Sequence, residues 1–280
     1  MAVKRIRTGK LSRIELRLVD VNGVLHGIAE EGDKRIVHIQ GEGGEDADRV
    51  WTRLHDEVTK KSVSYFGYEG AKTRFLKYFP GGFASDAYVG SGGKNGTGER
   101  AYKLAAKARL EAKVTPEAAA TGSGFGEAVT QAFVGTNLLE PKFELPKVGE
   151  IMRGARGDAF IRGAARFTLG DIKGGLAEME AAARPHEAAK WTLVTYLPFL
   201  WRPETHAFLK PQVTKDYAER VGHRFADVYE PALRPEIYAS LLDLYAKTGA
   251  AIADMNPRDN IDVQSFIWVV GKYTNESPAA

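Results

Sequence analysis

The stretch Ile14-Glu-Leu-Arg-Leu-Val-Asp-Val-Asn-Gly-Val-Leu-His-Gly-Ile28 decides the first part of the fold. Apolar residues alternate with polar ones from Ile14 to Leu18, which is typical of a strand with one buried face. Asn22-Gly23 then stands between apolar flanks, and both residue types tolerate the positive φ of a two-residue hairpin turn. The stretch predicts an antiparallel hairpin, to which Arg35 to Gln40 adds a third strand.

Most of the chain after these strands has helical spacing. Apolar residues recur at helical intervals in Asp46 to Lys61, and Ala71 to Phe79 predicts a short helix that stops at Pro80-Gly81. Further helices are expected at Glu99 to Val114, Glu127 to Phe133, Val148 to Arg153, Asp158 to Thr168, Asp171 to Ala183, Lys215 to Val221 and Pro235 to Asp254. Trp191 to Phe199 is the exception, because its β-branched and aromatic residues favour a buried strand or a rigid apolar stretch.

These patterns predict the α+β class, with an N-terminal antiparallel β-hairpin or meander and basic helices, followed by a mainly helical C-terminal half. The glycine cluster Thr121 to Gly126 is interpreted as the link between the halves. We therefore expect a basic α+β region over residues 1–120, with a possible nucleic-acid-binding surface. A mainly helical domain that holds the candidate site is expected over residues 127–275.

Composition limits the class of protein. The 280 residues, 44% of them hydrophobic, are enough to form a core without cross-links. The absence of cysteine excludes disulfides, thiolate metal sites and a cysteine nucleophile, and it favours a reducing compartment. No run approaches the roughly 18 apolar residues that a membrane span needs, and the start lacks the apolar region of a signal peptide. The expected protein is cytoplasmic and has no membrane partner.

Positive charge is concentrated in the first part of the chain. Residues 1–115 contain 21 Lys and Arg against 15 Asp and Glu, whereas the remainder contains 18 against 21. Between Lys60 and Lys113, 11 basic residues are interleaved with nine aromatic ones and only four acidic ones. This mixture suits phosphates and unstacked bases. The alternatives are amphipathic helices with core aromatics and solvated lysines, or another anionic partner.

Particular cations are candidates for DNA contacts. They fall on two predicted helices, with Lys210 added from the second half: Lys72, Arg74 and Lys77 on the first, and Arg100, Lys103 and Lys107 on the second. Between the helices, Gly90 to Gly98 has five glycines in nine residues, which predicts a flexible loop or an anion-binding nest. It lacks the GxxxxGK[ST] spacing of a nucleotide-binding P-loop.

The densest polar segment is Arg258-Asp-Asn-Ile-Asp-Val-Gln-Ser-Phe-Ile-Trp268. Asp259 or Asn260 is expected to cap a helix, which holds Asp262 and Gln264 rigidly at its start. Two interpretations remain open for Asp262. It completes the cap of the last helix, or it is a catalytic carboxylate that stabilises a cationic sugar while Gln264 reads a base edge.

Other catalytic classes lack their patterns. The six histidines have no metal-ligand spacing, no serine lies in a GxSxG elbow, and no acidic cluster supports a metal-dependent nuclease. We expect no metal and no cofactor. His206 lies close in sequence to Trp201, Arg202 and Lys210, and it is either a hydrogen-bonded structural residue or part of a site.

Three blocks of the chain resemble a family of bacterial proteins of unassigned activity. They are PFLWRPETHAFLKPQVTKDYAERVG, the stretch from Tyr229 to Tyr238, and PRDNIDVQSFIWVVG, all within residues 190–271. The chain is also similar to prokaryotic DNA glycosylases used in phage defence. In helix-hairpin-helix glycosylases a Lys-Thr helix precedes a catalytic aspartate, and Lys247-Thr248 followed by Asp262 is similar in order, although the LPGVG hairpin is missing.

The leading functional expectation is a DNA glycosylase that excises a modified base flipped out of a duplex. In that mechanism Asp262 stabilises the oxocarbenium-like sugar and positions water, with Gln264 and His206 at the same site. Tyr196 and Trp201 are expected to stack on the base. If Asp262 fails as the carboxylate, Asp259, Asp243 and Glu204 are the next candidates. The alternative is a non-catalytic nucleic-acid-binding or protein-interaction module, in which the polar segment only caps a helix.

Overall fold

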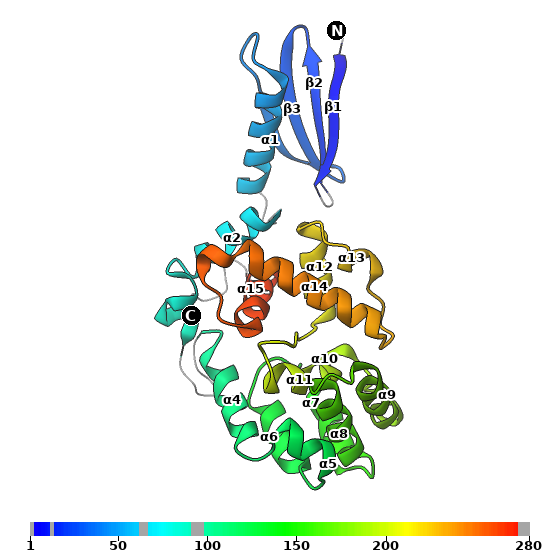
Figure 1. Cartoon of the computed structure of the whole chain (residues 1–280). Coiled ribbons are helices and arrows are strands. Elements are labelled where there is room, and N and C mark those ends of the chain that lie inside the picture. The colour runs from blue at the N-terminus through cyan, green and yellow to red at the C-terminus, as the bar shows by residue number, and fades with distance from the viewer. Residues whose placement is uncertain (1–2, 12–13, 62–66, 91–97, 274–280) are drawn as a thin grey trace. The chain divides into compact units, whose positions relative to one another are not determined.

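The structure is a computed structural model that describes residues 3–11, 14–61, 67–90 and 98–273, without the side chains of 59–61. Contacts between Cα atoms divide the chain into two compact units. Unit 1 comprises residues 1–74 and 219–222, and unit 2 comprises residues 75–218 and 223–280. The predicted α+β class is confirmed, because a four-stranded antiparallel sheet precedes a series of helices (Figure 1).

Unit 1 is built on a meander in the order β1-β2-β3-β4, with β1 at Val3–Leu11, β2 at Ile14–Val21, β3 at Val24–Glu31 and β4 at Lys34–Gln40. The predicted hairpin is confirmed, because Asn22 and Gly23 join β2 to β3 with φ angles of 56° and 86°. The predicted third strand is β4. Strand β1 was not predicted, since most of its side chains are exposed and leave no alternating pattern.

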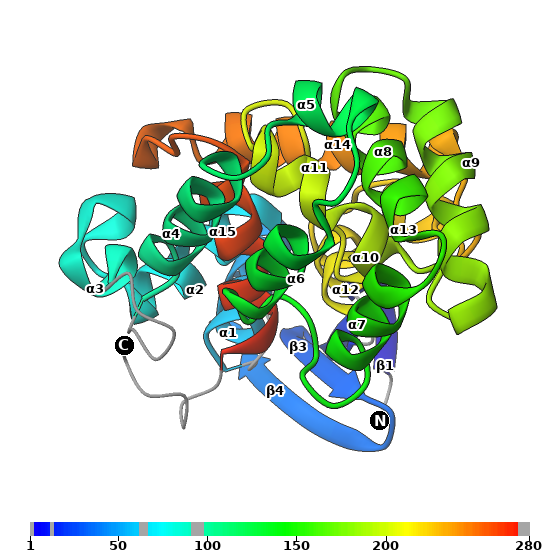
Figure 2. The same cartoon turned by 90° about the horizontal axis from the view of Figure 1, so that it is seen from below.

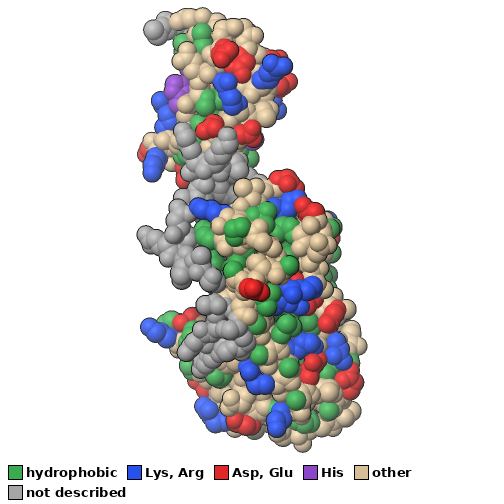
Figure 3. All heavy atoms as spheres, turned by 90° about the vertical axis from the view of Figure 1, so that its left-hand side faces the viewer, with side chains coloured by type: hydrophobic (Ala, Val, Ile, Leu, Met, Phe, Trp, Pro, Cys, Tyr) green, Lys and Arg blue, Asp and Glu red, His purple; other side chains and the backbone are tan. Residues whose placement is uncertain are grey.

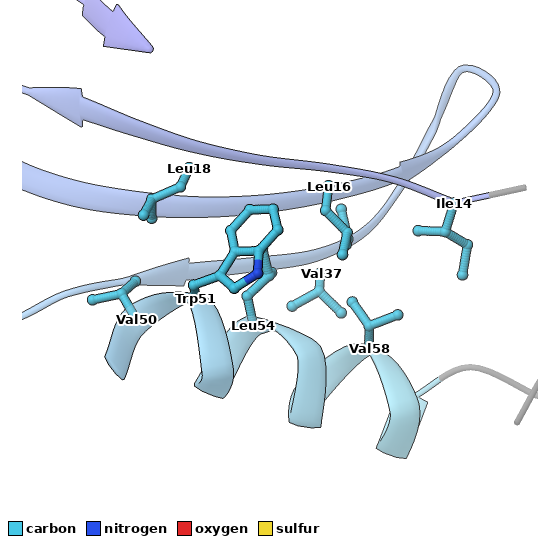
Figure 4. Packing of buried hydrophobic residues seen from close by; sticks show 9 residues of the cluster. Ile14, Leu16, Leu18, Val37, Val50, Trp51, Leu54 and Val58 are labelled. Carbon is cyan, nitrogen blue, oxygen red and sulfur yellow. The ribbon is translucent and has the colours of Figure 1, made fainter. Parts of the chain in front are cut away.

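The core of unit 1 lies between the sheet and α1 (Ala47–Lys61), which confirms the helix predicted there. Leu16 and Leu18 of β2 point toward the helix, and Trp51 and Leu54 of α1 point toward the sheet (Figure 4). The indole lies against Gly9 of β1, where a Cβ would come within 2.9 Å of the Trp51 ring. The apolar alternation of β2 and the helical spacing of α1 therefore meet in one core.

Unit 2 consists mainly of helices. Helix α2 (Gly67–Tyr78) crosses the boundary between the units. The later helices are α3 (Asp86–Val89), α4 (Ala101–Glu111), α5 (Pro116–Thr121), α6 (Gly126–Val134), α7 (Leu145–Arg153), α8 (Gly157–Thr168), α9 (Ile172–Ala183), α10 (Trp191–Val194), α11 (Tyr196–Trp201), α12 (Pro211–Arg220), α13 (Phe225–Val228), α14 (Pro235–Ala251) and α15 (Asn260–Lys272). Helices α4 and α6 lie side by side in Figures 1 and 2, as do α8 and α9.

Two predictions about the second half need correction. Residues 191–199 form no strand but the short helices α10 and α11, and every residue from Trp191 to Trp201 is buried. Because this segment is enclosed on all sides, its apolar run carries no periodicity that separates a strand from a helix. The glycine cluster at 121–126 connects α5 to α6 within unit 2, whereas the contacts place the division between the units at residues 74 and 75.

None of the described helices combines the length and the apolar composition that crossing a membrane requires.

Candidate functional site

The carboxylate of Asp262, in the first turn of α15, lies at the centre of a buried ionic cluster in unit 2. Its Oδ1 accepts hydrogen bonds from Tyr88 Oη at 2.6 Å and from Arg100 Nη1 at 2.8 Å. Its Oδ2 accepts from the backbone N of Arg258 at 2.8 Å and from the Arg258 Nε at 3.0 Å. Asp259 caps α15 and binds Arg100 through both oxygens. The Asp262 cluster, defined by these five residues, joins α3, α4 and α15.

The contacts within the Asp262 cluster favour the ionised forms of Asp262 and Arg100. Burial alone favours a protonated carboxyl, but hydrogen bonds from Arg258 and Tyr88 and the charge of Arg100 outweigh it, so the pKa of Asp262 is lowered. Burial disfavours the charged guanidinium of Arg100, yet Asp259 and Asp262 raise its pKa above the usual range. Burial and the neighbouring Asp262 raise the pKa of Tyr88, so this phenol remains a donor. The cluster is an ion pair network.

This geometry is at odds with the prediction that Asp262 is a catalytic carboxylate. The side chain is fully buried, and four donors occupy its two oxygens. A carboxylate needs a free face toward the sugar to stabilise an oxocarbenium ion. Of the substitutes, Asp259 is bound to Arg100, whereas Asp243 pairs with Lys247 and His223. Asp262 in this conformation ties helices together.

A second polar cluster lies next to it on α4 and α15. Lys103 is completely buried and donates from Nζ to Glu99 Oε2 at 3.2 Å and to Ser265 Oγ at 2.8 Å. Burial lowers the pKa of Lys103, and Glu99 opposes that shift. Tyr273 Oη donates to Glu99 Oε1 at 2.9 Å. Tyr102 Oη donates to Asn137 Oδ1 at 2.7 Å. Nothing in the sequence indicates that Glu99 belongs to a polar cluster, because its partner Tyr273 is distant in the sequence.

A small pocket opens beside Glu99. Its lining includes Tyr102, Asn137, Lys210, Gln264 and Trp268, and its volume is about 10 Å³, which is room for one water molecule. Gln264 is buried, and its Oε1 has no hydrogen-bond partner among the described residues. We call this the Gln264 pocket. It brings together two residues that the sequence singled out, Gln264 and Lys210, without Asp262.

Most of the cations expected on DNA are engaged inside unit 2. Arg100 and Lys103 are buried, so the predicted stripe on this helix is wrong. Lys107 donates to the backbone O of Trp201 and to Glu111, and Lys210 donates to the backbone O of Leu138 and to Glu144. A phosphate contact by either lysine would first have to break these bonds. On α2, Lys72 pairs with Glu69, Arg74 is partly exposed and Lys77 is exposed; their DNA contacts stay predictions.

The expected stacking residues Tyr196 and Trp201 lie in the core, which corrects that prediction. Both have no exposed surface. Tyr196 packs on Phe133 with ring centroids 4.1 Å apart and donates to the backbone O of Ala132. Trp201 Nε1 donates to the backbone O of Val114 at 3.0 Å. A ring enclosed on both faces has no surface left for a base.

The aromatic residues of the basic segment are also largely core. The rings of Phe75, Phe79, Phe83 and Tyr88 are buried against one another, with centroids 4.9–5.8 Å apart. The amphipathic interpretation therefore holds for these four. Tyr65, Phe66 and the loop residues 91–97 lie outside the described residues.

His206 is a hydrogen-bonded core residue. Its Nε2 donates to the backbone O of Thr168 at 3.0 Å, and its Nδ1 lies 3.0 Å from Tyr238 Oη. Burial lowers the pKa of this imidazole, so the neutral form is favoured. Its backbone O accepts from Asn260 Nδ2 at the start of α15. The catalytic role expected of His206 is replaced by a structural one.

Metal ligands do not gather in the described part of the chain, where no group of three or more His, Asp or Glu side chains could hold an ion. The sheet does bring two histidines together, with His26 Nδ1 3.1 Å from His38 Nε2. Strand pairing produces this contact, and the spacing of the two residues in the sequence does not reveal it.

A hollow with a volume of about 930 Å³ lies in unit 2 between the end of α4 and α6. Its walls include Phe125, Ala128 and Ala132, with Arg109 and Lys113 at the end of α4. Both cations are exposed, and neither forms an ion pair with any residue in ranges 3–11, 14–61, 67–90 or 98–273. We call this the α4/α6 groove. It offers an apolar wall beside unpaired positive charge.

On the face drawn in Figure 3, Lys and Arg side chains are interspersed with Asp and Glu. The features that mark the α4/α6 groove are its apolar wall and two cations that form no ion pair with the described residues.

Comparison of the chain with protein-family models, with curated proteins and with solved structures gave no match. The resemblances drawn from the sequence blocks stay predictions, and function is argued from the site alone.

Proposed function

We propose that the protein binds DNA non-catalytically, taking an unstacked strand in the α4/α6 groove. The observation that carries this proposal is the combination of Phe125 with the unpaired cations Arg109 and Lys113 around one hollow. A single strand presents flat base faces and regularly spaced phosphates, so it needs both an aromatic surface and cations. A paired duplex hides its base faces, which favours the single strand.

The arrangement of the cations supports this proposal. Arg109 lies in the last turn of α4 and Lys113 in the turn that follows the helix, and both residues line the same groove. The guanidinium of Arg109 lies close over Gly135 of the opposite wall, where a Cβ would come within 2.8 Å of its Nη2. Glu127 is the acidic residue of the lining, and Gln131 Nε2 donates to it at 2.9 Å. Two cations therefore face one hydrogen-bonded anion.

The first test is the aromatic wall. Phe125→Ala should weaken binding of a fluorescent single strand by about fivefold or more, because stacking on an aromatic ring contributes roughly 1–3 kcal/mol per base. Phe143→Ala is the matched control, since Phe143 is 75% exposed and does not line the groove. Equal affinities of the two variants would contradict the proposed placement of the strand.

A DNA glycosylase remains a second candidate because the Gln264 pocket contains a carboxylate. Glu99 and Gln264 line the same pocket, which places an acid beside an unpaired carbonyl able to read a base. In this version Glu99 takes the role that the sequence suggested for Asp262, and the pocket must widen to admit a base. The protein would then be a cytoplasmic enzyme, with phage defence as the setting that the resemblance suggests.

Base release decides between the two candidates. Duplexes with modified bases are incubated with the protein and treated with alkali, which cuts abasic sites. A glycosylase releases bases, and Glu99→Gln should slow release by a factor of about 100. No release by the wild-type protein, together with strand binding, supports the non-catalytic function.

A further inference from the structure

We propose that the Gln264 pocket receives the exocyclic amino group of a nucleobase, so that the bound strand is preferred where it contains cytosine or adenine in place of thymine. The inference rests on the proposed DNA binding and adds the base class that the protein selects. It starts from a buried side-chain carbonyl that the fold leaves without a partner.

The unpartnered carbonyl of Gln264 is the main observation. Gln264 is 5% exposed, and its Oε1 has no hydrogen bond within the described part of unit 2. A buried acceptor without a donor costs stability, because its hydration is lost and nothing replaces it. Apolar side chains would fit the same position of α15 without that cost. The carbonyl points to an occupant that brings an N–H or O–H donor.

The size of the pocket restricts the occupant. A volume of about 10 Å³ admits one water molecule or one amino group. A whole base does not fit, but an exocyclic amino group enters while its ring remains at the mouth. Trp268 is partly exposed and lines the pocket, so its indole offers the ring a stacking surface. The small interior of the pocket therefore suits the amino group, and the Trp268 indole at its opening suits the ring of the same planar base.

Glu99 supplies the second acceptor that an amino group needs. Its carboxylate offers about four lone-pair sites. Two donors reach these oxygens, namely Lys103 Nζ at 3.2 Å and Tyr273 Oη at 2.9 Å, because the single O–H of Tyr102 is donated to Asn137 Oδ1. Sites are therefore left on Glu99 for the occupant. An amino group has two N–H bonds, which match one remaining site on Glu99 and the free carbonyl of Gln264.

The rim of the pocket carries donors. Lys210 lines it, and the Oδ1 of Asn137 is taken by Tyr102, which leaves the Asn137 amide hydrogens available. Cytosine and adenine each place an acceptor ring nitrogen next to an exocyclic amino group, so both can pair with the acceptors inside the pocket and the donors on its rim. Thymine has the O4 acceptor where cytosine has the amino group. Thymine would place its O4 against the Oε1 of Gln264, and two acceptor oxygens with no hydrogen between them repel each other.

The test compares the two pyrimidines on single strands of equal length. The wild-type protein should bind oligo(dC) on the order of fivefold more tightly than oligo(dT), as one net hydrogen bond allows. Gln264→Leu should abolish this preference while affinity for oligo(dT) is retained, and it should raise the melting temperature because the orphan carbonyl is gone. Gln212→Leu is the control, since Gln212 lies on α12, away from the pocket, and donates a hydrogen bond to Asp216 of the same helix.

A second measurement separates this inference from the proposed function. Cytidine 5′-monophosphate and uridine 5′-monophosphate differ at the same amino position and need no strand-binding groove. The cytidine nucleotide should raise the melting temperature of the wild-type protein, and neither nucleotide should raise that of Gln264→Leu. If strands fail to bind but the cytidine nucleotide stabilises only the wild type, the groove proposal fails and the pocket stands.

Two results would overturn the inference. They are equal affinity of the wild type for oligo(dC) and oligo(dT), and a cytosine preference that persists in Gln264→Leu. If the second result comes with a raised melting temperature of Gln264→Leu, a structural water alone occupies the pocket. Strand binding through Phe125, Arg109 and Lys113 would remain intact in each case.

Discussion

At Asp262 three side chains from separate segments meet one carboxylate, so the residue is expected to control the stability of unit 2. Asp262→Asn keeps the shape of the side chain but removes the charge that pairs with Arg100 and Arg258. Removing one partner of a buried ion pair costs about 3–5 kcal/mol. Urea unfolding should therefore show a loss of at least about 3 kcal/mol at neutral pH.

The control is an aspartate with a similar local role on the surface. Asp171 caps α9 by accepting from the backbone N of Gly174, and its ion pair with Arg166 is exposed. Asp171→Asn should cost at most about 1 kcal/mol, because asparagine caps nearly as well as aspartate. Equal losses for the two variants would mean that Asp262 acts only as part of a helix start.

The pH dependence of stability follows from the lowered pKa of Asp262. A carboxyl whose folded pKa lies below its ordinary value of 3.8 contributes stability that is fully present above that value. The contribution disappears as pH falls through the folded pKa. The difference in unfolding free energy between the wild type and Asp262→Asn should be constant between pH 7 and about pH 5, and it should shrink below about pH 4. A constant difference down to pH 2 would contradict the ionised state of Asp262.

The α8 and α9 helices pack so closely that glycine is required at their contact. A Cβ on Gly175 would lie 2.5 Å from the backbone O of Gly163 and 2.6 Å from the backbone N of Phe167. Gly175→Ala should therefore destabilise the protein by about 1–3 kcal/mol, measured by thermal or urea unfolding.

Gly249 of α14, in contrast, has room for a Cβ. A Cβ there would meet only Val263 Cγ2 at 3.8 Å, which is an ordinary contact. Gly249→Ala should stabilise by about 0.5–1 kcal/mol, because alanine loses less entropy in a helix interior. If both alanine variants changed stability in the same direction, the close approach of α8 and α9 would not be the cause.

Local signals predicted the elements more successfully than the site. The Asn22-Gly23 turn and the apolar spacing of α1 depend on neighbours in sequence, so the pattern alone was sufficient. The segment of α10 and α11 failed because burial on all sides removes the polar positions that mark a period. Asp262 and Gln264 were found as residues of interest, but their surroundings were not.

The partners of the site are distant in sequence, which explains that failure. Arg100 and Asp262 are 162 residues apart, as are Lys103 and Ser265. From spacing alone, Arg100 and Lys103 look like part of a solvated basic stripe. Only their contacts with Asp262 and Ser265 of α15 show that both cations are hydrogen-bonded inside unit 2.

At the scale of the whole molecule, the two units have separate cores. The nine buried residues of the sheet–helix core all belong to unit 1. Leu54→Ala should therefore accelerate hydrogen exchange of amides in β2, β3 and β4, since truncating a buried leucine costs about 2–5 kcal/mol. Amides of α8 in unit 2 should keep their wild-type protection. A matching loss of protection in both units would show that they unfold as one.

The most direct measurement of the DNA-binding claim is the salt dependence of affinity for a single strand. Each phosphate contact contributes about 0.7 to the slope of log K against log salt concentration for single strands. Fluorescence anisotropy with oligo(dT) should therefore give a slope smaller in magnitude by about 1.4 for Arg109→Gln/Lys113→Gln than for the wild type. Lys173→Gln/Lys215→Gln removes the same charge from exposed positions of α9 and α12, and it should leave the slope unchanged. Equal slopes for the wild type and the Arg109/Lys113 variant would contradict the account.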